Sequence, residues 1–595
     1  MSQLVMELDT REALITRIRE VANGMEAFGP DFDPDVRIAD PRHGDYQANG
    51  VLAWAKQKRQ NPRLMAQQLV EGIQRHFDGK RVPWGKLEIA GPGFINFEMD
   101  SRWLLDWLLY FGCSDHLETA AKSIVGGRKI VVDFSSPNTA KQMHVGHIRS
   151  TVIGDVICRI LEFCGASVIR DNHIGDWGTQ FGILIMILKR NQVDLDSIAG
   201  DPIAVLEDLY RKGSALTQVD PSALDEARAE LVKLQGGDSE NLKIWRAIVD
   251  ISYGEFIKIY DRLDVRFDHV LGESFYRDQV ERVCSELEED GIASESQGAL
   301  VVFHPEHPRF ATQPFIIRKS DGASNYATTD LATALYRHEH FAADEVINVT
   351  DARQKDHFEQ LELTVRKWFE KRGRKLPVMK HVTFGTILGP DGKAIKTRSG
   401  ENVKLRELLD EACERARAIT AQKNPELSGA ELDAISTSIG IASVRYADLS
   451  QNRSSDYQFD WDKMLSFEGN TAPYLLYVSA RIHGILRKSG GVWTEPGRAA
   501  NRREMSLETP TEVALAKRLM QVVVVLKQTL EDLRPHYLGA YLYDLCADFN
   551  AFYHNDVVLH EDSNVRELRM HLCASTLSIL KRGLGLLGIP VLERM

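Results

Sequence analysis

Two histidines with one valine and one glycine between them are the residues of this chain best suited to phosphate chemistry. His144, Gly146 and His147 follow an apolar run at 129–134 and precede apolar residues spaced three and four apart. This order predicts a strand, a polar loop and a helix that begins near His144. A helix start offers unpaired N–H groups and a positive dipole end, so the pattern favours a bound phosphate.

Other interpretations of the histidine pair remain open on these residues alone. Two histidines at a helix start can be ordinary exposed residues. They can also bind a metal, although no HExxH pattern and no cysteine pair accompanies them. The loop before them has neither the glycine pattern of dinucleotide-binding folds nor the lysine of an NTPase phosphate loop. The rest of the chain must decide between these possibilities.

Length and composition set broad limits. A chain of 595 residues predicts several domains, and 43% hydrophobic with 27% charged residues is typical of a soluble globular protein. We expect no membrane span, because no long apolar run occurs. Seven scattered cysteines predict reduced thiols and a cytoplasmic protein. The net charge of −12 neither suggests nor excludes a nucleic-acid partner, since a local basic face suffices to bind one.

The elements that would position the histidines follow an α/β pattern. Residues 1–110 predict a separate α/β module, and from 129 strands and helices alternate as in a parallel sheet. Polar helices interrupt the alternation over 191–310, after which a strand at 315–318 resumes it. Further strands are expected at 345–350 and 380–388. Residues 406–595 are nearly all helical by period, including one long helix over 512–533.

Three further segments hold candidate functional residues. Glycines 175, 178 and 182 follow the second strand and favour close approach of a ligand, although a tight turn is an equal use. Asp330 at a predicted helix start is either a cap or a ligand. The lysine-rich segment 389–405 follows the last strand, where a surface loop and a phosphate-binding loop are both possible.

The C-terminal helices carry aromatic and polar residues that can stack unpaired RNA bases or serve only as core and surface. Four of them share one element: Asn470, Tyr474, Tyr477 and Arg481. A later aromatic stripe is expected to be mainly core: Tyr537, Tyr541, Tyr543, Phe549 and Tyr553.

Six motifs in this chain occur in the order found in bacterial-type arginyl-tRNA synthetases, which the chain therefore resembles. They are GDYQ-x-N, GPGFIN, SSPN followed by HVGH, GDWGTQFG, KTR-x-G and GNTA-x-YLLY. The HxGH sequence is the signature of class I aminoacyl-tRNA synthetases. Their second ATP motif, KMSKS, is degenerate here as Lys396-Thr397-Arg398-Ser399, a departure common in arginyl enzymes. It leaves open which basic residue holds the triphosphate.

The resemblance implies an architecture for the whole chain. It comprises an N-terminal α/β tRNA-binding domain (1–110) and a Rossmann-like class I catalytic domain (120–400) with a helical insertion (191–310). A helical connective region (401–464) and an all-α anticodon-binding domain (465–595) follow.

The resemblance also implies the reaction: ATP-dependent activation of L-arginine and its transfer to the 3′ ribose of tRNA(Arg). ATP and Mg²⁺ are the expected cofactors, no resident metal is expected, and tRNA binding must precede activation.

The catalytic residues would be His144, His147, Lys393 and Lys396, and Gly146, Thr397 and Arg398 would also bind ATP. Arginine would be held by Ser136, Asn138, His147, Glu273, Tyr326, Asp330 and Gln354, with Asp133 a further candidate. The tRNA contacts would include Asn470, Tyr474, Tyr477 and Arg481, and a monomer is expected.

Three alternatives are weaker. A cysteinyl-tRNA synthetase needs a zinc site that the cysteine spacing does not provide. A nucleotidylyltransferase of the same fold would not need two tRNA-facing modules. An RNA-binding protein without catalysis would not need both the HxGH sequence and the lysine loop.

Overall fold

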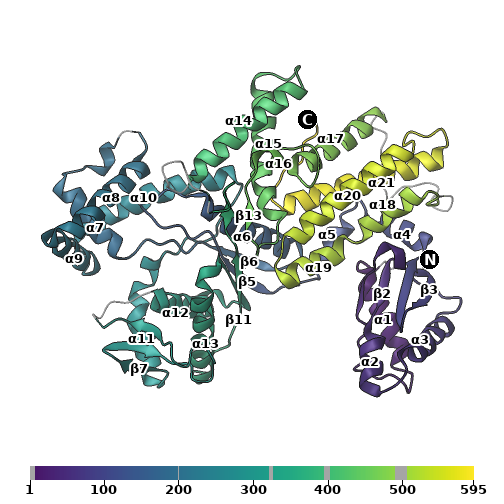
Figure 1. Ribbon diagram of the computed structural model, residues 1–595, viewed down its shortest axis with the longest axis horizontal. Helices are drawn as coiled ribbons and strands as arrows, with labels where there is room; N and C mark the ends of the chain where they lie inside the picture. The colour runs from purple at the N-terminus through teal and green to yellow at the C-terminus, as the bar shows by residue number, and fades with distance from the viewer. Residues whose placement is uncertain (1–6, 199, 321–325, 394, 396–402, 490–504) are drawn as a thin grey trace. The chain divides into compact units, whose positions relative to one another are not determined.

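The computed structural model describes residues 7–198, 200–320, 326–393, 395, 403–489 and 505–595. The chain forms two compact units (Figure 1). One contains Met1–Ile124, Phe467–Asp532 and Tyr537–Met595, and the other contains Val125–Ser466 and Leu533–His536. Each unit is described separately below.

The N-terminal part of the first unit is an antiparallel sheet with strand order β1-β2-β4-β3. Its strands are β1 (Val36–Ile38), β2 (Tyr46–Ala48), β3 (Trp84–Ala90) and β4 (Phe94–Met99). Its helices are α1 (Thr10–Ala22), α2 (Gly50–Lys58) and α3 (Pro62–His76). The GDYQ and GPGFIN segments pair directly, since Tyr46 lies opposite Phe97 and Gln47 opposite Asn96. The Gln47 amide donates to Asn96 Oδ1 at 2.8 Å, so these two motifs form one structural element.

The rest of the first unit is helical (Figure 1). Its helices are α4 (Ser101–Phe111), α5 (His116–Ala121), α17 (Ala472–Lys488), α18 (Pro510–Met520), α19 (Val522–Asp532), α20 (His536–Asn555) and α21 (Ser563–Leu586). The single helix expected over 512–533 is two helices, α18 and α19, which separate at Gln521. A capping box of Thr509 and Glu512 begins α18, with Pro510 at its first position.

The second unit contains a parallel sheet with strand order β11-β10-β5-β6. The strands are β5 (Lys129–Asp133), β6 (Ser167–Asp171), β10 (Glu345–Asp351) and β11 (Val378–Phe384). The central strand β5 buries Ile130, Val131 and Val132, as a strand covered on both faces requires. The chain leaves β5 towards β6 on one side and later adds β10 and β11 on the other. The strand order therefore reverses between β5 and β10, and such a switch point binds ligands at the strand carboxyl ends.

The helices that accompany this sheet are α6 (Val145–Phe163), α7 (Thr179–Arg190), α12 (Tyr326–Tyr336) and α13 (Lys355–Lys371). Helix α12 ends in a π-helical turn, Arg337–Phe341. Two buried ion pairs join α6 to α15 (Gly429–Leu449): Arg149 lies 3.0 Å from Asp448, and Arg445 lies 2.7 Å from Asp155. The unit also contains α14 (Leu405–Lys423), α16 (Trp461–Met464) and the paired strands β12 (Ile387–Leu388) and β13 (Tyr457–Gln458).

The inserted segment is only partly helical. Helices α8 (Pro202–Val219), α9 (Pro221–Gln235) and α10 (Ser239–Arg262) share a core with α7. After α11 (Val280–Glu289), the strands β7 (Ala293–Ser296), β8 (Ala299–Val302) and β9 (Phe315–Arg318) form an antiparallel sheet. The expectation that 315–318 rejoins the parallel sheet is therefore wrong. Gln297 and Gly298, both with positive φ, form the two-residue turn that pairs β7 with β8.

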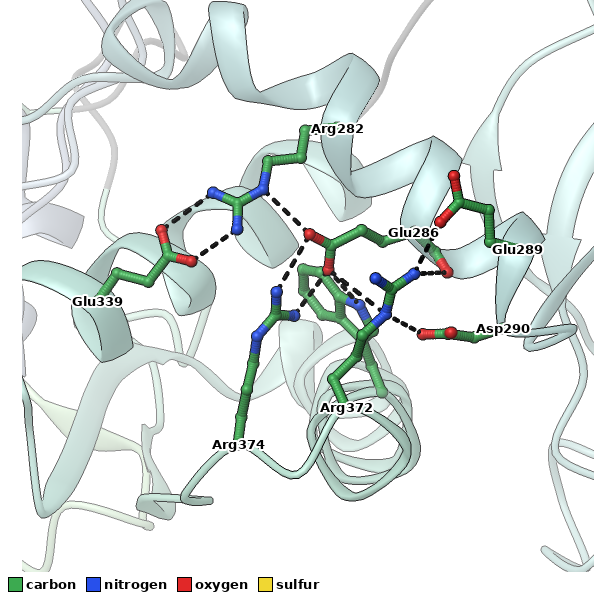
Figure 2. Close-up of polar contacts among 8 residues, drawn as sticks. Arg282, Glu286, Glu289, Asp290, Glu339, Arg372 and Arg374 are labelled. Carbon is green, nitrogen blue, oxygen red and sulfur yellow. Dashed lines mark hydrogen bonds and ion pairs between the residues drawn. The ribbon is translucent and has the colours of Figure 1, made fainter.

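A network of arginines and carboxylates binds α11 to the segments at the ends of α12 and α13 (Figure 2). Glu286 accepts from Arg374 at 2.7 and 3.1 Å, from Arg282 at 3.0 Å and from the indole of Trp368 at 3.0 Å. Arg282 donates two more hydrogen bonds to Glu339, at 2.7 and 3.0 Å. Because Glu286 is buried and multiply bonded, this network fixes the positions of both helices relative to α11.

Candidate active site

The two histidines close a hydrogen-bonded cap at the start of α6. His144 is the N-cap residue, and its Nδ1 accepts from the Gly146 N–H at 3.1 Å. His147 lies three residues further on, and its Nδ1 accepts from the His144 N–H at 3.0 Å. The ring centroids are 4.0 Å apart. Because each Nδ1 accepts a backbone N–H, each neutral ring carries its proton on Nε2.

The surroundings of both imidazole rings disfavour their protonated, positively charged form. Burial, followed by the neighbouring His144, lowers the pKa of His147 to about 3. The pKa of His144 is also lowered, by burial and then by Lys141 and Arg353. Both rings are therefore neutral at physiological pH and have an Nε2–H to donate to an oxygen.

Gly146 is required by the cap itself. A Cβ at this position would lie 2.8 Å from Cε1 and 2.9 Å from Nδ1 of the His144 ring. Gly146 is also exposed, which leaves its backbone open to a ligand. Any side chain here would displace the imidazole of His144.

The end of the lysine-rich segment lies beside the histidines. The Val145 N–H donates to Val403 O at 2.9 Å, and the Leu405 N–H donates to Met143 O at 2.9 Å. At the other end of the segment, exposed Lys393 closes a turn through its carbonyl, which accepts from the Gly389 N–H at 2.7 Å. The predicted ATP ligands Lys396, Thr397 and Arg398 lie outside the described residues. The chain thus returns from this loop directly to the start of α6.

The loop between β5 and α6 is held in an unusual backbone conformation. Ser135 and Ser136 have φ of 73° and 48°, in the left-handed region. The Ser136 N–H donates to Asn172 Oδ1 at 3.1 Å, and its hydroxyl donates to Asp133 Oδ1 at 3.2 Å. These bonds to strand-end residues fix the loop at the carboxyl edge of the sheet.

The GDWG segment supports Asn138. The Gly175 N–H donates to Pro137 O at 3.1 Å, and a Cβ at Gly175 would lie 2.1 Å from Asn138 Oδ1. Gly175 is therefore needed for contact with Asn138, and Gly182 lies inside α7 against the backbone of α9. The expectation that these two glycines admit a ligand is wrong. Gly178 has a φ of 131° and forms the turn into α7, which is the other use the sequence allowed.

Carboxylates gather around α12. Asp330 lies one turn inside the helix, so it is no cap, and its Oδ2 lies 2.5 Å from Nε2 of His357. Burial, followed by the charges of Asp330 and Asp176, raises the pKa of Glu273 to about 8. Tyr326 at the helix start is 70% exposed. Tyr326 and Asn138 line one cavity of about 110 Å³, so two segments far apart in sequence converge on the same space.

Two other predicted arginine-binding residues, Asp133 and Gln354, have surroundings unlike those of Asp330 and Tyr326. Asp133 accepts from Arg337 at 2.6 Å as well as from Ser136, so its carboxylate holds the structure beneath the site. Arg337 is buried and also donates to Asp171 of β6 at 2.8 Å and to Asn348 of β10 at 3.2 Å. Gln354 is exposed on the turn before α13.

Comparison with known proteins identifies the family. Residues 12–99 match the arginyl tRNA synthetase N terminal domain, 115–461 the catalytic domain of class I (R) tRNA synthetases, and 475–595 the DALR anticodon binding domain. The chain is 43% identical over 560 residues to the arginine–tRNA ligase of Pseudoalteromonas atlantica, covering 93% of this chain and 94% of that protein. The chain belongs to the arginyl-tRNA synthetase family.

Further relatives agree with this membership. The arginine–tRNA ligase of Erwinia tasmaniensis is 43% identical over 588 residues, covering 97% of this chain and 98% of the relative. Among solved structures, the arginyl-tRNA synthetase of Plasmodium falciparum has a TM-score of 0.82 at 29% identity, with 100% of both chains covered. That of Thermus thermophilus has a TM-score of 0.80 at 25% identity, covering 98% of this chain and all of that one. The class I synthetase fold predicted from the sequence is confirmed.

Within the part that matches the anticodon binding domain of this family, a groove of about 690 Å³ opens between α17, α20 and the C-terminus. Arg481 lies over the rings of Tyr477 and Tyr553, at 4.9 and 5.5 Å from their centroids. Both tyrosines are 41% exposed. The basic residues that line the groove are Arg481, Arg487, Lys488 and Arg594. Tyr553, expected to be core, instead lines this open surface.

Of the other two predicted tRNA contacts, Tyr474 is half-buried and accepts from the Asn550 amide at 2.9 Å. Asn470 is exposed just before α17. Neither lines the groove.

Sequence reasoning did not single out three residues that the structure places in contact with predicted site residues. They are His357 beside Asp330, Lys404 beside His144 and Arg337 beside Asp133. His357 follows Gln354 by three residues, a spacing that predicts a shared helical face. Nothing in the sequence could indicate that Lys404 forms a β-bridge with His144.

In the described part of the chain, no group of three or more His, Cys, Asp or Glu side chains could hold a metal ion. Among the described helices, none has the length and apolar character needed to cross a bilayer.

Proposed function

We propose that this protein is an arginine–tRNA ligase, which activates L-arginine with ATP and esterifies tRNA(Arg). One observation carries the proposal. The two-histidine helix start follows β5, and the loop between them is bonded to the end of that strand through Ser136. Two carboxylates join segments at the same carboxyl edge of the sheet: the Glu273 N–H donates to Ile174 O after β6, and Asp330 accepts from His357 at the start of α13, after β10. Family membership agrees with this chemistry.

In the first step, an oxygen of the arginine carboxylate attacks the α-phosphorus of ATP. The bond to the bridging oxygen breaks, pyrophosphate leaves, and arginyl-adenylate remains. His144 and His147 donate their Nε2–H groups to phosphate oxygens on which negative charge develops. Because the rings are neutral and already hydrogen-bonded through Nδ1, they need no rearrangement to do so.

The lysine-rich segment contributes positive charge to the triphosphate. Lys393 and Lys396 act as point charges on the β- and γ-phosphates, together with Thr397 and Arg398. The backbone bonds between 143–145 and 403–405 support this role, because they bring the segment back to the helix start.

Arginine is selected by acceptors that match the donors of its guanidinium. Glu273 and Asp330 bind the guanidinium, and Tyr326 and Gln354 complete that end. Ser136, Asn138 and His147 hold the α-amino and carboxylate groups. The charge of Asp330 contributes to the raised pKa of Glu273, and a cation bound between the two carboxylates would offset their repulsion, which supports this placement.

In the second step, a hydroxyl of the 3′ terminal ribose attacks the carbonyl carbon of the adenylate and AMP leaves. The anticodon is bound by α17 and the groove beside it, through Asn470, Tyr474, Tyr477 and Arg481. Exposed tyrosines against an arginine suit base stacking, which supports this assignment. We also propose that tRNA binding precedes activation.

Magnesium enters this proposal only as a companion of ATP. The described residues offer no cluster for a resident ion, and Mg²⁺ in ATP enzymes is bound largely by substrate phosphates and water. When bound, it neutralises charge on the leaving pyrophosphate. A cytoplasmic location and a monomeric state complete the proposal.

Charging assays test the function directly. Purified protein, ATP, Mg²⁺ and tRNA(Arg) should yield acid-stable radiolabel on tRNA with labelled arginine and none above background with labelled lysine. Charging with another amino acid, or no charging with any, would contradict the proposal.

A further inference from the structure

His357 lies in the first turn of α13, beside the carboxylate proposed to bind the guanidinium. Its Nε2–H donates to Oδ2 of Asp330 at 2.5 Å, across the space between α13 and α12. The two side chains are 28% and 22% exposed. His357 also follows Gln354 by only three residues. Gln354, another proposed arginine contact, lies on the turn just before this helix.

Asp330 needs such a partner because it lies near a second carboxylate. The charge of Asp330 contributes to the raised pKa of Glu273. Two carboxylates near one another repel when both are ionised, and a free Asp side chain could rotate away. A hydrogen bond to Oδ2 opposes that rotation and leaves Oδ1 for another donor.

The surroundings hold His357 in place. The ring of Phe315 on β9 lies 5.5 Å from the imidazole. The ends of α12 and α13 are fixed to α11 by the network centred on Glu286, through Glu339 after α12 and Arg374 after α13 (Figure 2). The two helices that carry Asp330 and His357 are thus both held to α11 at their C-terminal ends.

We propose that His357 is a positioning residue for guanidinium recognition: it orients the Asp330 carboxylate for arginine and thereby favours arginine over lysine. The inference rests on the proposed function and deepens it. A guanidinium uses a planar pair of acceptors, whereas an ammonium does not depend on their plane. Loss of the orientation should therefore weaken arginine binding more than lysine binding.

A purely structural role is the competing explanation, because the pair also connects α12 to α13. The chain offers a matched control. His307 donates from the inserted segment to Glu359 of the same helix α13, at 3.1 Å and with 24% and 35% exposure. His307→Ala removes a comparable histidine–carboxylate pair without touching Asp330.

The experiment measures KM for arginine and for ATP and kcat in tRNA-dependent pyrophosphate exchange, together with Tm, for four proteins. His357→Ala should raise KM for arginine about tenfold, the factor expected for one hydrogen bond to a charged group. KM for ATP should stay within about twofold of the unsubstituted protein, because no phosphate contact is lost. His357→Gln, whose Nε2 can replace the donor, should recover most of the arginine affinity, and His307→Ala should leave both KM values unchanged.

A double-mutant cycle makes the result specific. In an Asp330→Asn background, His357→Ala should have no further effect on KM for arginine, since the carboxylate to be oriented is gone. Unchanged arginine KM in His357→Ala, an equal rise in both KM values, or additivity in the cycle would overturn the inference. Failure of the unsubstituted protein to exchange with arginine would overturn the proposed function instead.

Discussion

Both histidines at the start of α6 use the same ring nitrogen for structure and keep the other for chemistry. Each Nδ1 accepts a backbone N–H, which fixes the Nε2–H tautomer without any side-chain partner. The same residues thus cap the helix and keep an Nε2–H each for the donor role that we propose. This dual use explains why Gly146 is needed, since a Cβ there would strike the ring of His144.

Substitution of His147 should separate these two roles. His147→Ala should lower kcat by about 100- to 1,000-fold, as loss of one transition-state donor does, and should destabilise the protein by about 1 kcal/mol through the lost cap. His147→Asn keeps an acceptor at the Nδ1 position but has no donor at Nε2. It should therefore regain the stability and remain inactive in pyrophosphate exchange. Near-normal exchange by either variant would rule out the donor role.

Glu273 should make arginine binding depend on pH. With a pKa of about 8, raised by burial and then by Asp330 and Asp176, Glu273 is mostly protonated below that pH in the free protein. A bound guanidinium stabilises the carboxylate, so binding below about pH 8 releases a proton. KM for arginine should therefore fall as pH rises from about 6.5 to 8, by at most about tenfold per pH unit.

Two control measurements test whether Glu273 causes this pH dependence. KM for ATP should show no parallel trend, and Glu273→Gln should remove the slope while raising KM for arginine. Tyr326, whose pKa is raised by burial and by Glu273, ionises well above this range and should not contribute. A slope that persists in Glu273→Gln would assign the proton to another group.

At the scale of elements, two ion pairs whose members are all buried join α6 to α15. Arg149 and Asp448 are each 1% exposed, and Arg445 and Asp155 are fully buried. Removing one member of a buried pair leaves an uncompensated charge, which is far more costly than loss of a surface pair. These pairs fix the helix whose start holds the histidines.

Asp448→Ala should therefore lower the free energy of unfolding by about 3–5 kcal/mol, because Arg149 is left without its carboxylate. The control is Asp433→Ala on the same helix α15, where Asp433 and Arg417 are 59% and 53% exposed. That change should cost less than about 1 kcal/mol. Equal losses in urea denaturation of the two variants would show that the α6–α15 pair contributes no special stability.

The elements predicted from the sequence differ from the structure where long-range contacts decide. Periodicity predicted that residues after 406 are nearly all helical, as α14 and α15 illustrate, because each of these helices buries one apolar face. It could not show that 315–318 pairs with β8, since a short strand has no local signal for its partner. It also gave no mechanism for GDYQ, whose Asp45 accepts from the Met99 N–H at 2.7 Å and lies 2.9 Å from Lys517. Those partners are 54 and 472 residues away.

The site itself was predictable in its residue types more than in its geometry. HxGH indicated a phosphate site, and the structure adds the tautomer that makes both rings donors. Asp330 looked like a possible cap, yet it lies a full turn inside α12 and bonds to His357. Spacing along the chain cannot reveal that contact, because it depends on how two helices pack on separate strands.

At the scale of the whole molecule, the chemistry and the proposed RNA-reading surface belong to different compact units. The groove lined by Tyr477, Arg481 and Tyr553 lies in the first unit, and the histidines lie in the second. Substitutions in the groove should therefore affect tRNA without affecting the small substrates.

Tyr553→Ala should raise KM for tRNA by about tenfold or more, since stacking one base on an aromatic ring is worth about 1–3 kcal/mol. KM values for arginine and ATP should not change. Tyr537→Ala, at the other end of α20 and outside the groove lining, is the control and should charge tRNA normally. A similar loss in both variants would indicate damage to the helix and would contradict the stacking role.

Pyrophosphate exchange across a panel of amino acids tests the central claim most directly. The claim is that the two-histidine helix start and the carboxylates of Glu273 and Asp330 together activate arginine on ATP. Exchange should occur with arginine in the presence of tRNA(Arg), and should be at background with lysine, cysteine or methionine and whenever tRNA is omitted. Exchange with another amino acid, or none with arginine and tRNA present, would contradict it.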